Sequence, residues 1–147
     1  YKDNVTGQKL GLFQWDEGLA KSAQEYADEI APRLLNEELD TVHHSDFPLG
    51  ENMSGTSFGW KHDMTCSPGI LRYHNEWKYY DLNRQEWEND PDGANRFSYD
   101  KALHFVQMMR PNATKVGCGF AFTIDENIDD DREKIKKKVE ICHYYYM

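Results

Sequence analysis

Residues 116–124 read VGCGFAFTI, and this stretch decides the fold class. Its apolar and aromatic side chains recur at every second position, which is the spacing of a β-strand with one buried face. The same alternation returns near the C-terminus, at Val139, Ile141, His143 and Tyr145. Residues 125–138, which separate the two segments, are highly charged and have no apolar period, so they predict a solvent-exposed loop. Together these features predict an antiparallel hairpin.

Upstream of the hairpin, the first helical segment covers residues 15–30, where apolar side chains recur at steps of three and four. Asp16 is the predicted N-cap, and Pro32 is predicted to end the helix. A polar stretch follows over residues 36–45 and leads into a predicted turn at residues 48–50.

Two further helices are predicted before the hairpin. One begins at Ser67, as an N-cap followed by Pro68 in the first turn, and runs to about Leu82. The other is capped by Ser98 and stops before Pro111. Helices joined by loops to a terminal hairpin predict a mixed, layered domain of the α+β class.

Length and charge narrow the function classes. The chain has 147 residues, the size of one domain with a hydrophobic core of its own. Its formal net charge of -9 argues against nucleic acid as a partner, because such binding draws on Lys and Arg side chains that neutralise phosphates. No apolar run approaches the ~20 residues that span a bilayer, so no transmembrane segment is expected.

Cysteine and glycosylation motifs favour a secretory route. Cys66, Cys118 and Cys142 allow one internal disulfide and leave one thiol over, and composition does not choose the pairing. Three Asn-X-Ser/Thr sequons also suit a secreted protein. They begin at Asn4, Asn52 and Asn112.

Five motifs, in the same order along the chain, resemble those of the CAP superfamily, which includes cysteine-rich secretory proteins, antigen 5 allergens and pathogenesis-related class 1 proteins. The motifs are WDEGLAKSAQ at 15–24, HSD at 44–46 with GENM at 50–53, NEWK at 75–78, HFVQ at 104–107 and VGCG at 116–119. The resemblance implies a three-layer α-β-α sandwich with a small antiparallel sheet between helical layers. It also implies that residues 1–147 form a single secreted domain, trimmed at both ends.

The resemblance further implies a cleft in which four of these positions meet. His44 and His104 would be the metal-capable imidazoles, with Glu51 and Glu76 as their acidic companions. Two imidazoles suit zinc or a similar divalent ion, with water completing the coordination, and two direct ligands predict weak, reversible binding. The alternative is a hydrogen-bonded polar cluster that ties the loop and helices together.

Lipid binding is the leading functional expectation, because several members of the family bind sterols or fatty acids outside cells. The predicted loop over residues 54–67 contains Phe58, Trp60 and Met64, and it lies where relatives carry an aromatic sterol-binding loop. A groove between helices is where others hold an acyl chain. Alternatively, Phe58 and Trp60 pack this loop onto the core.

Two other classes of function remain open. A metal-dependent hydrolase would use His44, Glu51, Glu76 and His104 as its catalytic set. No nucleophile is recognisable, because Ser45 follows His44 directly and neighbours in an extended loop point to opposite sides. Binding is therefore favoured over catalysis. The third class is a protein with a vestigial cleft whose acidic surface engages an extracellular receptor.

The family pattern also bears on the cysteines and sequons. It implies a disulfide between Cys118 and Cys142, worth roughly 3 kcal/mol. It implies that Asn52 is buried and unglycosylated, which leaves Asn4 and Asn112 as the glycosylation candidates. Arg110 replaces the aromatic residue that the family has after the third-helix motif, so the cleft rim or the core packing is altered there.

Overall fold

The computed structural model describes residues 12–35, 43–57, 65–79, 102–110, 112–131 and 133–146. Its helices and strands are, in chain order, β1 (Gln14–Trp15), α1 (Glu17–Leu35), β2 (Gly50–Ser57), α2 (Ser67–Asn75), the 3-10 helix η1 (Glu76–Tyr79), α4 (Leu103–Met108), β3 (Ala113–Ile124) and β4 (Ile135–Tyr146). Within these ranges, no helix is both long and apolar enough to cross a membrane.

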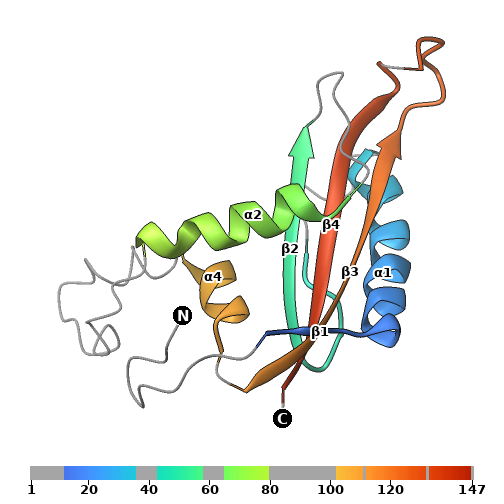
Figure 1. The fold of residues 1–147 in the computed structure, drawn as a ribbon. Coiled ribbons are helices and arrows are strands. Elements are labelled where there is room, and N and C mark those ends of the chain that lie inside the picture. The colour runs from blue at the N-terminus through green and yellow to red at the C-terminus, as the bar shows by residue number, and fades with distance from the viewer. Residues whose placement is uncertain are drawn as a thin grey trace.

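Four strands form one sheet in the order β1-β3-β4-β2 (Figure 1). The predicted hairpin is confirmed: β3 and β4 are antiparallel, and Cys118 lies directly opposite Cys142. A disulfide joins these two cysteines, as the family pattern implied, and Cys66 lies outside it. The sheet is not purely antiparallel, because the short β1 pairs with β3 in parallel.

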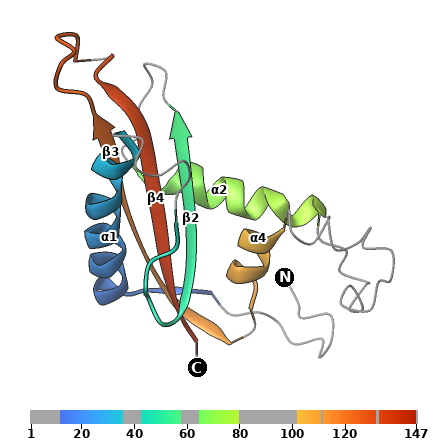
Figure 2. The same ribbon diagram turned by 180° about the vertical axis from the view of Figure 1, so that it is seen from behind.

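Helices cover both faces of the sheet, which gives the three-layer α-β-α arrangement that the family pattern implied. α1 lies on one side, and α2 and α4 lie on the other (Figures 1 and 2). Alternate residues of β4 supply the two cores. Val139 and Ile141 pack with α1, whereas Cys142 and Tyr144 pack with Tyr73 of α2.

The close packing of α1 on β3 depends on two glycines. A Cβ at Gly117 would lie 2.0 Å from the backbone nitrogen of Ala20, and one at Gly119 would lie 2.5 Å from the Cα of Gln24. The amide of Gln24 then bonds both the N–H and the carbonyl of Phe120, which locks helix to strand. The flat Gly-Cys-Gly segment therefore sets the distance between the two layers.

An ion pair is buried under α2. The Nζ of Lys138 lies 2.8 Å from Oε1 of Glu140, and both side chains are almost fully shielded from water. Neither Glu140 oxygen has a hydrogen-bond partner among the described residues, so charge rather than aligned hydrogen bonds holds the pair. Arg72 approaches the same carboxylate at 3.7 Å.

The helix boundaries differ from prediction in two places. Pro32 lies inside α1, which continues to Leu35, so the predicted stop is wrong. Proline removes one backbone hydrogen bond, but Ala31 and Leu34 are buried in the core, and this burial offsets the loss. Asp16 does cap the helix, because its Oδ1 accepts the N–H of Leu19 at 3.0 Å.

The second helix starts one residue from its predicted cap. Ser67 is the first residue of α2, and the N-cap is Cys66, which makes no side-chain capping bond. Pro68 does lie in the first turn. The predicted end at Leu82 and the predicted cap Ser98 lie outside the described residues, and the described part of the third helix is Leu103–Met108.

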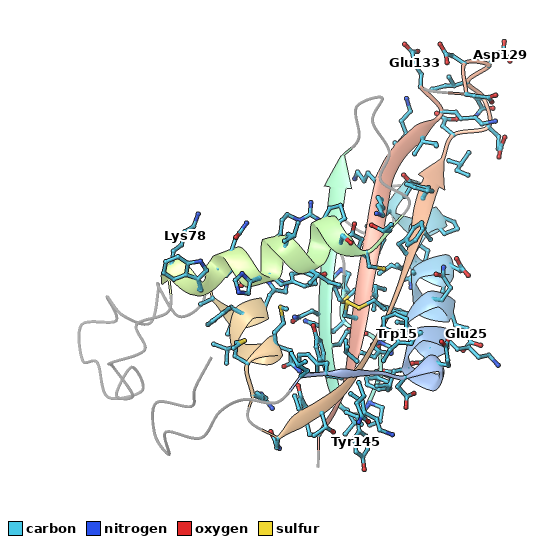
Figure 3. All side chains as sticks on the ribbon, in the orientation of Figure 1. Trp15, Glu25, Lys78, Asp129, Glu133 and Tyr145 are labelled. Atoms are coloured by element: carbon cyan, nitrogen blue, oxygen red, sulfur yellow. A yellow bond between two sulfur atoms is a disulfide. The ribbon has the colours of Figure 1, made fainter. Side chains whose placement is uncertain are left out.

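The sequence pattern does not predict β2: Gly50 lies in the predicted turn, and residues 54–57 lie in the predicted loop. The strand has no apolar alternation, because it reads GENMSGTS. The side chains of Glu51, Asn52 and Ser54 bond residues of neighbouring elements. The charged loop between β3 and β4 does project from the body, with Asp129 and Glu133 at its tip (Figure 3). β4 already begins at Ile135, so the last part of the predicted loop is strand.

Candidate functional site

Glu51 is the centre of the first polar cluster. It lies on β2 opposite His143 of β4, and its side chain is only 5% exposed. Oε2 accepts hydrogen bonds from Nε2 of His143 at 2.8 Å and from the Ser45 hydroxyl. Oε1 accepts from Nδ1 of His44 at 2.7 Å and from the Ser45 N–H at 2.9 Å. Burial alone would raise the pKa of Glu51, but these four donors together lower it to about 2.

His143 extends the cluster to α1. Its Nδ1 lies 2.7 Å from the hydroxyl of Ser22, which also donates to the Leu19 carbonyl. The ring of Phe47 stacks on the imidazole with centroids 3.9 Å apart. Nε2 donates to the Glu51 carboxylate, and the single hydroxyl proton of Ser22 is shared between Nδ1 of His143 and the Leu19 carbonyl. Hydroxyl, imidazole and carboxylate thus form one chain across the interface between α1 and the sheet.

His44 and Ser45 reach the same carboxylate, which corrects the expectation that their side chains point to opposite sides. The segment before β2 turns here, and the Ser45 hydroxyl also accepts the N–H of Phe47 at 3.1 Å. The His44 ring is 70% exposed, so its remaining edge faces solvent. The Ser45 hydroxyl donates its proton to Glu51, so it is not placed as a nucleophile beside a general base.

Glu76 and His104 form a second pair. Oε1 of Glu76 lies 2.7 Å from Nδ1 of His104, while Oε2 accepts the backbone N–H groups of His104 and Phe105 at the start of α4. A carboxylate is favourable there, because the unpaired N–H groups of a helix start carry partial positive charge. Nε2 of His104 lies 3.1 Å from the carbonyl of Met53. Glu76 therefore holds both the His104 ring and the start of α4 in place.

The structure brings each predicted histidine to one of the two predicted glutamates, in two separate pairs. Successive β2 residues point to opposite faces, so Glu51 faces α1 and Asn52 faces α4. The Asn52 amide donates to the His104 carbonyl at 3.0 Å and to the Tyr144 hydroxyl at 3.1 Å.

Two hollows adjoin the Glu51 cluster. The larger has a volume of about 650 Å3 and lies between α1 and residues 43–47. The smaller has a volume of about 330 Å3 and lies between residues 44–51 and α4. His44 lines both, whereas His104 is not among the described residues that line either.

The two rings differ in how well they fit the expected metal. Both nitrogens of His104 lie within hydrogen-bond distance of oxygen atoms, Nδ1 of the Glu76 carboxylate and Nε2 of the Met53 carbonyl, so neither nitrogen is presented to an ion. His44 is exposed and uses Nδ1 towards Glu51. In the part of the chain that the structure describes, no group of three or more His, Cys, Asp or Glu side chains could hold a metal ion. A site that uses both imidazoles would therefore need His104 to release the Met53 carbonyl, and zinc binding stays a prediction.

Several predicted residues lie outside the described ranges. These are the lipid-loop candidates Phe58, Trp60 and Met64 and the glycosylation candidate Asn4. Asn112 is described and exposed just before β3, and its glycosylation stays a prediction. Asn52 is buried and its amide is engaged, in agreement with the expectation that its sequon carries no glycan.

Sequence reasoning missed His143 and Ser22. A signal was present, because His143 shares an alternating face with Val139 and Ile141, and a histidine on a buried face needs a polar partner. Its partners could not be named, because the pairing with Glu51 depends on the register of β2, a strand that the pattern did not reveal. Ser22 gives no such signal, because it is a polar residue outside the apolar face of the predicted helix.

Comparison with known proteins agrees with this architecture. The family model described as "CAP: Cysteine-rich secretory protein family" matches residues 6–127. Venom allergen 3 of Solenopsis invicta is 32% identical over 113 residues, which cover 76% of this chain and 44% of that protein. The chain thus spans less than half the length of this curated relative.

Solved structures share the fold. MpPR-1i superposes with a TM-score of 0.52 at 19% identity, over 92% of this chain and 73% of that one. BmVAL-1 superposes with a TM-score of 0.54 at 22% identity, over 92% of this chain and 59% of that one. With the family match over most of its length, the chain belongs to the CAP family of cysteine-rich secretory proteins.

Proposed function

We propose that this chain acts outside cells as a binding protein, and that the hollow beside α1 reversibly holds a sterol or a fatty acid. The observation that carries the proposal is the hollow of about 650 Å3, a volume within the usual range of small-molecule sites. Tyr26 and Phe47 supply aromatic surface to its wall, and Ser22 and His44 supply polar groups that could orient a ligand.

An extracellular location is supported by two features. The Cys118–Cys142 disulfide joins central strands, and such bonds persist in oxidising compartments. The relative named Venom allergen 3 carries a name that refers to venom, which is a secreted fluid. Both features fit a protein that meets its ligand outside the cell.

Hydrolysis is the second candidate, and the chain from Ser22 through His143 to Glu51 is the observation that favours it. Binding remains the better-supported function. Ser22 lies inside α1, where neighbouring N–H groups are used by the helix and leave no donors for an oxyanion. The Ser22 hydroxyl is also shared with the Leu19 carbonyl.

The lipid proposal can be tested with radiolabelled cholesterol and with a fluorescent stearate analogue. Glu29→Trp places an indole at the wall of the larger hollow, whereas Lys21→Trp places one on α1 away from it. We expect saturable binding of one lipid by the wild type and by Lys21→Trp, and at least tenfold weaker binding by Glu29→Trp. Binding of neither lipid would reject the proposal, and turnover of a generic ester that Ser22→Ala abolishes would favour the hydrolase.

Weak zinc binding is the remaining part of the proposed function, and His44 is the residue best presented for it. A site that also uses His104 requires this ring to release the Met53 carbonyl. Calorimetric titration with zinc should therefore give weak binding that either His44→Ala or His104→Ala removes. Loss in His44→Ala alone would rule out the two-imidazole site.

A further inference from the structure

The smaller hollow contains two polar atoms that the fold leaves unsatisfied. Nε2 of Gln107, on α4, and the hydroxyl of Tyr146, at the end of β4, are both shielded from water. Among the described residues, neither atom has a hydrogen-bond partner. Leaving buried polar groups unpaired is costly, and native structures seldom do so without a reason.

Both atoms converge on Gly50. A Cβ at this position would lie 1.8 Å from Nε2 of Gln107 and 1.9 Å from the Tyr146 hydroxyl oxygen. The glycine therefore creates the room in which the amide and the phenol come together. The two groups line the hollow of about 330 Å3 that also opens onto His44 and Arg110.

Charges of both signs face this hollow, from Arg110 and from Glu51. The guanidinium of Arg110 lies over the ring of Tyr146, 5.1 Å from its centroid. Burial raises the pKa of Tyr146, which keeps the phenol protonated and able to donate at neutral pH. Glu51 also lines the hollow and is ionised, so it repels an anion, and Arg110 supplies the opposite charge. Its oxygens already accept hydrogen bonds from His44, Ser45 and His143 and do not take up the donors of Gln107 and Tyr146.

We propose that this hollow binds an anionic oxygen group, the carboxylate or phosphate of a small molecule, through Arg110, Tyr146 and Gln107. The guanidinium at the mouth attracts the anion and can bond two of its oxygens. The phenol and the amide are shielded in this structure, so binding requires a small turn of these side chains to direct their hydrogens to the anion, where exclusion of water strengthens such bonds. The proposal does not depend on the lipid proposal, which concerns the larger hollow beside α1.

The test uses butyrate and inorganic phosphate as probes, with sodium chloride of equal ionic strength as the reference. We expect one probe to cause saturable shifts of the Gln107 side-chain amide and the Arg110 Nε resonances in ¹H–¹⁵N spectra. The preferred probe distinguishes a carboxylate from a phosphate ligand. Shifts that do not saturate, or that chloride reproduces, would overturn the proposal.

Adjacent tyrosines provide a matched pair of variants. Tyr146→Phe removes the hydroxyl in the hollow, and Tyr145→Phe removes an exposed one beside Lys115. Loss of one bond to a charged ligand should weaken binding by about tenfold or more in Tyr146→Phe and leave Tyr145→Phe unchanged. Tyr146→Phe should also raise the midpoint of thermal unfolding by about 2–4 °C, because it deletes an unpaired buried group.

The role of the Arg110 charge is tested with a second matched pair of variants. Arg110→Gln and Lys21→Gln each remove one positive charge, but only Arg110 lines the hollow. We expect the first variant to lose the saturable shifts and the second to keep them. Equal losses in both would mean non-specific attraction, and unchanged affinity in Tyr146→Phe would show that the hydroxyl contacts no anion. Either result would overturn the proposal, whatever the outcome for lipids.

Discussion

Replacement of Glu51 by glutamine should remove a large, pH-dependent part of the stability. Four donors hold the pKa of this carboxyl at about 2, against an ordinary value of 4.5. A difference of this size corresponds to about 3 kcal/mol of folding free energy at neutral pH. Glutamine keeps the shape but offers one acceptor oxygen, and its NH2 group faces donors. We expect Glu51→Gln to lower the free energy of unfolding at pH 7 by about 3 kcal/mol.

The direction of the pKa shift decides whether the contribution of Glu51 to stability rises or falls with pH. The folded state lowers the pKa of Glu51, so its contribution is complete above pH 4.5 and is lost as the pH falls towards 2. Urea unfolding, followed by tryptophan fluorescence at pH 7, 5, 4, 3 and 2, measures this directly. Other carboxyl groups titrate in both proteins and cancel in the difference between wild type and variant.

A control separates this effect from general loss of charge. Glu25 is exposed and forms a surface ion pair with Lys21, so Glu25→Gln should change the free energy of unfolding by less than about 0.5 kcal/mol at every pH. A wild-type-to-Glu51→Gln difference that stays constant from pH 7 to pH 2 would refute the reasoning, because the four hydrogen bonds would then not favour the ionised carboxyl.

Three further predictions concern packing. Replacing Cys118 and Cys142 by alanine should lower the free energy of unfolding by about 3 kcal/mol, measured by urea titration. Gly117→Ala should cost about 2 kcal/mol or more in the same assay, because the added methyl meets the backbone of α1; an unchanged midpoint would contradict the close contact. Lys138→Met alone should cost about 3 kcal/mol, because it leaves the buried Glu140 carboxylate to the more distant and partly exposed Arg72, whereas Lys138→Met with Glu140→Leu should recover most of this loss.

The sequence predicts the hairpin and the first helix well, because both bury one face and therefore leave a periodic pattern. β3 and β4 appear where the alternation places them, and Asp16 caps α1 as expected. The end of α1 was not predictable from Pro32, because burial of Leu34 in the core outweighs a local preference. A local sequence pattern does not show such tertiary effects.

The candidate site was predictable only in part. The resemblance of the motifs to those of the CAP family identified His44, Glu51, Glu76 and His104 as site residues. The structure pairs each of these histidines with a glutamate. The link from Glu51 through His143 to α1 depends on strand register, which no local pattern records. The unsatisfied groups of the smaller hollow were equally hidden, because burial without a partner is a property of three-dimensional packing.

Because both faces of β4 are buried, the strand limits where insertions and deletions can occur in the sequence. Seven consecutive residues, 138–144, are buried, and even and odd positions serve opposite cores. Deleting a single codon within this run would send the following side chains into the wrong layer and move His143 away from Glu51. Extra codons between Asp129 and Glu133 would lengthen a tip that stands clear of the body and leave both strands in phase (Figure 3). Length variation among natural relatives, and any inserted peptide tag, should therefore be tolerated at that tip and not in the strand below it.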